Sequence, residues 1–94
     1  MGTYPRLKQK RLSEKLRAIR DAFGISQSEM LKRLGAEELF EYNRISEFES
    51  GKREPPLLIL LRYARAANIS TDILIDDELD LPAKLPAKPK QSPR

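Results

Sequence analysis

Apolar residues recur at helical spacing through most of the chain, and they predict a series of short helices. The first run gives one apolar face to a helix over residues 11–23, and Gly24 is suited to end it. The members of this face are Leu12, Leu16, Ile19 and Phe23.

A second helix is predicted over residues 27–34 by its start and stop signals. Ser26 and Glu29 have the spacing of a capping box, in which the serine oxygen accepts from the N–H at position 29 and the glutamate reaches back. Gly35 is expected to end this helix. The positions expected to face inward are Met30, Leu31 and Leu34.

The third predicted helix has a clear end and an open beginning. Ile45 and Phe48 can share a helical face, and Gly51 is expected to stop the helix. The start is left open between Glu41 and the earlier Glu37. In the second case Glu37 and its neighbour lie in the first helical turn, where the helix dipole favours acids.

Two further helices complete the pattern. Pro56 suits the first turn of a fourth helix, and Asn68 can take the left-handed conformation at its end. Its apolar face is expected to be Leu57, Leu60, Leu61, Ala64 and Ala67. Leu58 and Ile59 lie outside that face and are candidates for core packing or for a dimer contact.

Ser70 is predicted to cap a short fifth helix. Its inward residues are Ile73 and Leu74.

The pattern divides the 94 residues into one domain and two ends. Residues 1–10 are interpreted as a basic N-terminal arm, and residues 11–76 as the folded domain. Residues 77–94 are interpreted as an acidic stretch followed by a Pro/Lys-rich disordered tail, because a repeated Leu-Pro-Ala-Lys cannot build a core.

Charge is distributed unevenly along the chain. Residues 1–20 contain seven Lys/Arg and one Glu, and residues 82–94 contain four Lys/Arg and no acid. Residues 21–81 contain seven Lys/Arg and 13 Asp/Glu, so the domain is acidic between two basic ends. Nonspecific attraction to a polyanion would therefore depend on the ends, with Lys8, Lys10 and Arg11 as a basic arm or merely a solubilising one.

Composition removes several function classes. The chain has no Cys and no His, which excludes disulfides and thiolate metal sites and removes the commonest general base. No catalytic motif, phosphate loop, cofactor site or small-molecule substrate site is evident. The longest apolar run, residues 57–61, is too short to cross a bilayer. The simplest expectation is a cytoplasmic protein that is not an enzyme.

Two segments carry a family resemblance. "SQSEMLKRLG" at the second helix and "ISEFESGKREP" at the end of the third resemble the Cro/C1-type, Xre-like helix-turn-helix family of phage repressors. The resemblance covers roughly residues 11–75. It implies an all-α, five-helix lambda-repressor-like fold that places its third helix in the DNA major groove, while the second helix crosses the backbone.

The resemblance assigns roles to individual residues. Gln27 matches a position that touches phosphate and braces the third helix, and Arg20 and Glu49 match a structural ion pair. Four residues match positions that face base edges or flanking phosphates: Tyr42, Asn43, Arg44 and Glu47. Lys52 and Arg53 match the loop that lies on the DNA backbone.

The chain departs from the family pattern in two ways. Gly35 and Gly51 are 16 residues apart, about four more than is usual in the family, so the connection between the second and third helices is lengthened. Leu31 stands where the family usually has a small residue. We expect one adaptation, in which the third helix stands off and Leu31 with Leu39 or Phe40 fills the gap.

Less specific interpretations accompany these roles. Asn43 and Arg44 have the donors and acceptors to read adenine and guanine, or they are solvated early-helix residues. Tyr42 contacts DNA or packs beneath the insertion. Glu47 accepts from cytosine or repels phosphate, and either effect favours selectivity. The acids Glu37 and Glu38 are expected to face water or a partner.

The resemblance implies a sequence-specific transcriptional regulator, with repression the expected direction. It would bind a two-fold symmetric operator in double-stranded DNA as a homodimer, because one short helix touches few base pairs. The alternative is a protein–protein interaction module or an antitoxin that keeps the fold and binds DNA weakly. The two are distinguished by whether Asn43 and Arg44 matter for DNA binding.

Overall fold

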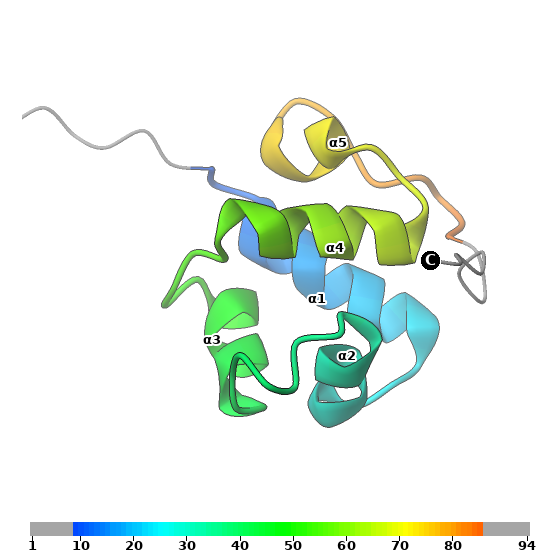
Figure 1. The fold of residues 1–94 in the computed structure, drawn as a ribbon. Coiled ribbons are helices and arrows are strands. Elements are labelled where there is room, and N and C mark those ends of the chain that lie inside the picture. Colours follow the sequence, from blue (N-terminus) through cyan, green and yellow to red (C-terminus); the bar gives the residue numbers. More distant parts are fainter. Residues whose placement is uncertain (1–8, 86–94) are drawn as a thin grey trace, which may run out of the picture.

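The computed structural model describes residues 9–85, and this range contains five α-helices and no β-strand. The helices are α1 (Leu12–Phe23), α2 (Gln27–Arg33), α3 (Asn43–Ser50), α4 (Leu57–Ala67) and α5 (Thr71–Ile75). In Figure 1, α4 lies between α5 on one side and the α2–α3 pair on the other. Helix α1 contacts both α3 and α5. The all-α, five-helix prediction is confirmed.

Local signals place most of the helix ends. Gly24 and Gly51 end α1 and α3 with φ of 68° and 82°, and Asn68 ends α4 with φ of 59°. The hydroxyl of Ser26 accepts from the Glu29 N–H at 3.1 Å, which is one half of the predicted capping box. Ser70 precedes α5 in an extended conformation, but its side chain makes no cap hydrogen bond.

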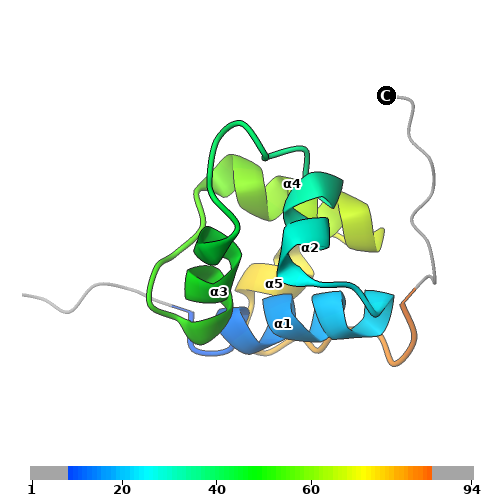
Figure 2. The ribbon, with the colours of Figure 1, turned by 90° about the horizontal axis from the view of Figure 1, so that it is seen from below.

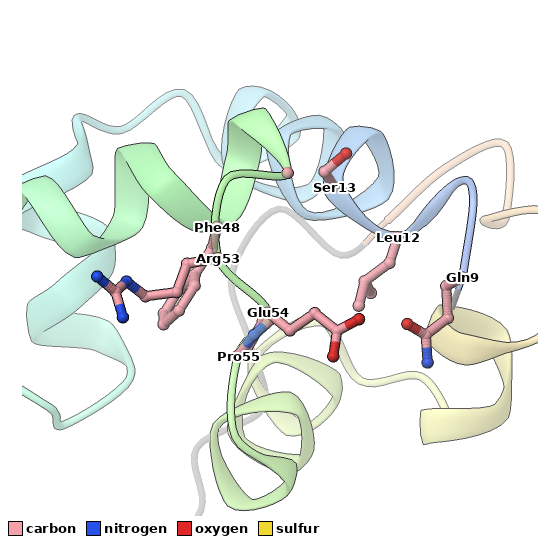
Figure 3. Close-up of a pocket in the computed structure, with 8 residues that line it drawn as sticks. Gln9, Leu12, Ser13, Phe48, Arg53, Glu54 and Pro55 are labelled. Carbon is pink, nitrogen blue, oxygen red and sulfur yellow. The ribbon is translucent and has the colours of Figure 1, made fainter. Parts of the chain in front are cut away.

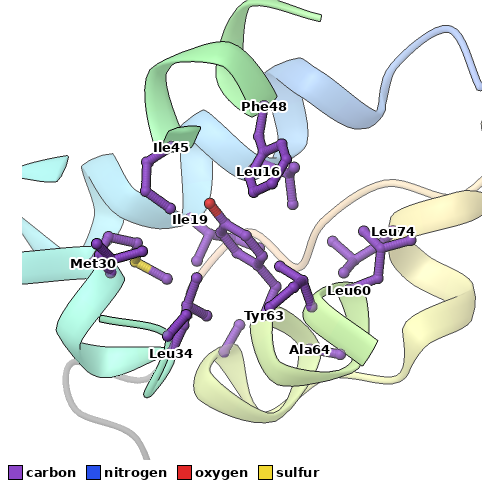
Figure 4. Packing of buried hydrophobic residues seen from close by; sticks show 14 of the residues in the cluster. Leu16, Ile19, Met30, Leu34, Ile45, Phe48, Leu60, Tyr63, Ala64 and Leu74 are labelled. Atoms are coloured by element: carbon purple, nitrogen blue, oxygen red, sulfur yellow. The ribbon is translucent and has the colours of Figure 1, made fainter. Parts of the chain in front are cut away.

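The core draws on all five helices and centres on Tyr63 of α4 (Figure 4). The largest side chains that are almost completely buried are Tyr63, Phe48, Leu16, Ile19, Met30, Ile45 and Leu74. Burial raises the pKa of the Tyr63 phenol, and the nearby carboxylate of Glu49 adds to the rise. The Tyr63 hydroxyl has no hydrogen-bond partner among the described residues.

The predicted apolar face of α4 is wrong at its start. Leu57 and Leu58 are 79% and 69% exposed, whereas Ile59 is 3% exposed and belongs to the core. The buried positions recur as Ile59, Leu60, Tyr63, Ala64 and Ala67. Leu57 and Leu58 occupy the first turn directly after Pro56, ahead of this stripe. A run of five apolar residues does not reveal which of them face the core.

Two cationic side chains donate hydrogen bonds to backbone carbonyls at the ends of helices that are distant from them in the sequence. The ammonium of Lys15 is buried and donates to the carbonyls of Ile73 at 2.7 Å and Asp76 at 2.9 Å, at the end of α5. The guanidinium of Arg62 donates to the carbonyls after α2, those of Leu34 and Gly35. The last carbonyls of a helix and those just beyond it have no N–H partner within the helix, and each of these cations donates to such groups.

The acidic segment after α5 lies against the start of α1, 66 or more residues away in the sequence. The carboxylate of Asp77 accepts from the backbone N–H groups of Lys10 at 2.8 Å and Arg11 at 3.1 Å. These bonds lower the pKa of Asp77. The Arg11 guanidinium also donates to the Asp80 carboxylate at 2.7 Å. The beginning of the predicted tail is therefore bound to the body.

The same contacts bear on the predicted basic arm. The guanidinium of Arg11 donates to the backbone carbonyl of Asp77 and to the carboxylate of Asp80, so this cation of the predicted arm has partners within the chain. Leu81 and Leu85 also pack against the core cluster. The rest of the predicted arm and tail, in residues 1–8 and 86–94, lies outside the described residues.

Candidate nucleic-acid interface

The connection between α2 and α3 is long and stands out from the body as an arch (Figure 2). Leu31 at its base is 6% exposed. Of the two residues expected to fill the gap, Phe40 packs against the core, and its ring meets the Phe48 ring edge-to-face with centroids 5.9 Å apart. Leu39 is 60% exposed and does not fill it.

Helix α3 begins at Asn43, close to the later of the two predicted starts, near Glu41, and the earlier start at Glu37 is wrong. The N–H groups of Leu39 and Phe40 donate to the carbonyl of Ala36 at 3.0 and 3.1 Å, which closes a turn ahead of the helix. Ala36 is completely buried and fixes this turn to the core. Glu37 and Glu38 lie in the turn and are exposed, so the prediction that a helix dipole stabilises them is wrong.

The first residues of α3 face outward. Tyr42 occupies the N-cap position, is 60% exposed, and does not pack beneath the connection. Asn43 is the first helical residue and is also exposed, while Arg44 is partly covered. The connection and the start of α3 together line an open hollow whose polar groups include Asn43 and Arg44. Side chains that can donate and accept hydrogen bonds are thus concentrated at this end of the helix.

Glu47 joins the start of α3 to the loop that follows the helix. One of its carboxylate oxygens is 3.2 Å from Nε of Arg44 and 3.0 Å from Nε of Arg53. The two cations therefore share one acid. The backbone carbonyl of Glu47 also accepts from the N–H groups of Lys52 at 3.0 Å and Arg53 at 3.2 Å. The loop is fixed to α3, and the Lys52 side chain is left exposed.

An ion pair fixes the orientation of α3 against α1. The Arg20 guanidinium donates to the two oxygens of Glu49, from Nε at 2.7 Å and from Nη2 at 3.0 Å. It also donates to the carbonyl of Ile25 at 2.9 Å. The bond to Glu49 raises the pKa of Arg20. The Gln27 amide donates to the same carboxylate at 3.4 Å, so the start of α2 is connected to the pair.

The loop after α3 borders the beginning of the described chain. A small hollow lies between them, lined on one side by Gln9 and Leu12 and on the other by Arg53 and Pro55 (Figure 3). Gln9, the first described residue, therefore lies beside the loop that carries Lys52.

A comparison with protein families identifies the family of this chain. Residues 16–74 match the helix-turn-helix family model. The chain belongs to the Cro/C1-type helix-turn-helix family. The resemblance predicted from the sequence is confirmed, and the chain is a DNA-binding helix-turn-helix regulator. Neither the search of curated proteins nor that of solved structures found a match. No helix among the described residues is long and apolar enough to cross a membrane.

Within this family framework, α2 and α3 are the helix-turn-helix pair, and the predicted site residues fall into two groups. Gln27, Arg20 and Glu49 meet at the base of the pair. Arg44, Glu47 and Arg53 meet on its outer side. The side chains of three further site residues are exposed and belong to neither group: Tyr42, Asn43 and Lys52.

Sequence reasoning did not assign a role to Phe40 next to Arg44. The Arg44 guanidinium carbon is 5.1 Å from the centroid of the Phe40 ring, within the range of a cation–π contact. The only sequence signal for this contact is that Phe40 and Arg44 are four residues apart. This spacing brings two side chains together only if the backbone between them is helical or nearly so. With the start of the helix undetermined, that signal could not be used.

Proposed function

We propose that this protein is a sequence-specific transcriptional regulator that reads operator DNA with the first turn of α3. The observation that carries the proposal is the exposure of Asn43 and the outer part of Arg44 at the start of a helix whose orientation is fixed by the Arg20–Glu49 ion pair. A reading helix must present polar side chains from a rigid support, because a misplaced donor loses its hydrogen bond to the base.

Each exposed residue has a role that its chemistry supports. Asn43 can bond adenine through its amide, and Arg44 can bond guanine through its guanidinium. Lys52 and Tyr42 suit contacts to phosphates, which position the protein without reading sequence. Gln27 lies at the N-terminus of α2, where backbone N–H groups favour an anion. Its bond to Glu49 connects this phosphate position to α3.

The proposed assembly is a homodimer on a two-fold symmetric operator, acting as a repressor. Helix α3 has eight residues, so one copy reaches only a few base pairs. Two copies would read half-sites roughly 34 Å apart, or a multiple of that distance. Leu57 and Leu58 are the most exposed large apolar side chains described, and they supply an apolar surface for the second copy. The bound dimer would repress transcription by blocking polymerase from the operator, and no catalysed reaction would be needed.

Selection from a pool of randomised duplexes tests this function. The full-length wild type and the double variant Asn43→Ala/Arg44→Ala are each allowed to select bound sequences, after thermal melting shows that both are folded. The proposal expects a palindromic motif for the wild type and loss of its specific positions in the variant. The same motif from both proteins, or no enrichment from the wild type, would reject it.

A second candidate function is an interaction module that binds DNA weakly. It is favoured by the exposed acids Glu37, Glu38 and Glu41 at the edge of the site, because phosphates repel them. If this function is the true one, the Asn43→Ala/Arg44→Ala variant binds every duplex as the wild type does. Binding of both proteins would then be uniform across sequences and would disappear as salt is raised.

A further inference from the structure

Arg44 lies between an aromatic ring and a carboxylate. Its guanidinium is over the Phe40 ring, 5.1 Å from the centroid, and its Nε is 3.2 Å from the carboxylate of Glu47. The side chain nevertheless remains 33% exposed. It is therefore held from two sides while its outer part faces the surrounding solution.

The ring that covers Arg44 is itself fixed to the core. Phe40 meets Phe48 edge-to-face at an interplanar angle of 88°, and Phe48 is 1% exposed. The backbone N–H of Phe40 donates to Ala36, which is completely buried. Both the side chain and the backbone of Phe40 are thus anchored. The lengthened connection thus places the anchored ring of Phe40 beside the start of α3.

We propose that Phe40 is a positioning residue for DNA recognition, and that it holds Arg44 in the conformation that reads a guanine. The inference rests on the proposed reading role of α3. A free arginine side chain loses much rotamer freedom when it binds, and one that is already held loses less. The lengthened connection then serves specificity, since it supplies the ring that orders the reading side chain.

Glu47 completes the arrangement from the other side. The carboxylate lies beside Nε of Arg44, at 3.2 Å, and no contact among the described residues engages the two Nη groups, which can therefore bond O6 and N7 of guanine. The same carboxylate also engages Arg53, so the positive charge near Arg44 is partly neutralised. Nonspecific attraction to phosphate is reduced, and correct base contact becomes a larger share of the binding free energy.

The test uses the full-length protein and compares the base preference of variants in the randomised-duplex selection. Arg44→Ala first identifies the base-pair position that Arg44 reads. Phe40→Leu removes the ring while keeping an apolar side chain against Phe48, and Phe40→Tyr keeps the ring. Leu39→Ala is the matched control in the same connection. The double variant Phe40→Leu/Arg44→Ala shows whether the two residues act together.

At the position that Arg44 reads, Phe40→Leu is expected to lower the preference for guanine roughly two- to fivefold, the range of an exposed cation–π contact. Phe40→Tyr and Leu39→Ala are expected to retain it, and the double variant to match Arg44→Ala. The inference is overturned if Phe40→Leu keeps the full preference there or weakens all sequences equally. If Arg44→Ala alters no position, the proposed reading by Arg44 fails first, which separates the two ideas.

Because Phe40→Leu also changes core packing, the order of the Arg44 side chain is measured independently in the wild type. NMR of its Nε–H group is expected to show a rigid guanidinium with a ring-current shift. An Arg44 side chain that rotates freely in solution would overturn the inference without any variant.

Discussion

Arg20 and Glu49 join α1 to α3 through two parallel hydrogen bonds of 2.7 and 3.0 Å. Glu49 is only 5% exposed and Arg20 16%, so both charges are largely removed from water. The pair lies behind the proposed reading surface rather than in it. A defect in DNA binding after its removal would therefore report the loss of a support and not of a DNA contact.

Arg20→Ala is expected to destabilise the fold by about 3–5 kcal/mol, because the buried carboxylate of Glu49 loses its partner. Chemical denaturation with circular dichroism measures this change. The matched control is Arg17→Ala on the same helix. The ion pair of Arg17 with Asp21 is exposed, so this variant should lower the free energy of unfolding by at most about 1 kcal/mol. Equal losses for the two variants would contradict a structural role for the pair.

Glu47→Gln is expected to strengthen binding to scrambled DNA and to narrow the gap between specific and scrambled duplexes. Removing the acid leaves Arg44 and Arg53 without their shared partner, so both cations become available to phosphate. The dependence of log affinity on log salt should steepen by about 0.9 for each of these cations that comes to contact a phosphate. Asp72→Asn, which removes the same charge from α5, is the control. Unchanged affinity for scrambled DNA in Glu47→Gln would show that the acid does not restrain these cations.

Tyr63→Phe is expected to leave stability unchanged or to raise it by about 1 kcal/mol. The hydroxyl is buried without a partner among the described residues, and an unsatisfied buried polar group costs about 1–3 kcal/mol. Phenylalanine preserves the ring that fills the centre of the core (Figure 4). Thermal unfolding of the two proteins makes the comparison. A clear fall in the melting temperature of Tyr63→Phe would indicate that the hydroxyl is bonded.

Asp77→Asn is expected to destabilise the protein at neutral pH and to make no difference in strong acid. The folded state lowers the pKa of Asp77 because the N–H groups of Lys10 and Arg11 donate to it. Its contribution is therefore fully present above the unfolded-state pKa, near pH 4, and is lost as pH falls through the lower folded-state pKa.

Denaturant unfolding at a series of pH values from 7 to about 2 tests this prediction. The stabilities of the wild type and Asp77→Asn should converge as the pH falls. Glu78→Gln removes the same charge from the neighbouring position and is the control for net charge. A constant difference between the wild type and Asp77→Asn across the series would rule out this role for the carboxylate.

The sequence predicted most of the fold because its signals are local. The Ser26 cap and the turns at Gly24, Gly51 and Asn68 depend on residues within one or two turns of each helix end. The family motif then identified α2 and α3 as the helix-turn-helix pair. Local signals could not show the start of α3, because Leu39 and Phe40 are both apolar and only the buried turn at Ala36 decides which of them faces the core.

The missed contacts join residues that are far apart in the sequence. The buried ammonium of Lys15 reaches carbonyls 58 and 61 residues away, and Asp77 reaches the start of α1 across 66 and 67 residues. From the sequence alone, Lys15 in a helix and Asp77 in a Pro-containing tail would each be expected to face solvent. Only the packing of α5 onto α1 brings their partners within reach.

The most direct test of the proposed function is the ratio of dissociation constants for the selected and scrambled duplexes. It is measured with the wild type and with Asn43→Ala/Arg44→Ala at matched salt and confirmed folding. Each bidentate base contact contributes on the order of 1–3 kcal/mol of discrimination, so the variant should lose at least about tenfold in this ratio. Its binding to the scrambled duplex should change much less. A ratio that stays the same in the variant would contradict base reading by α3.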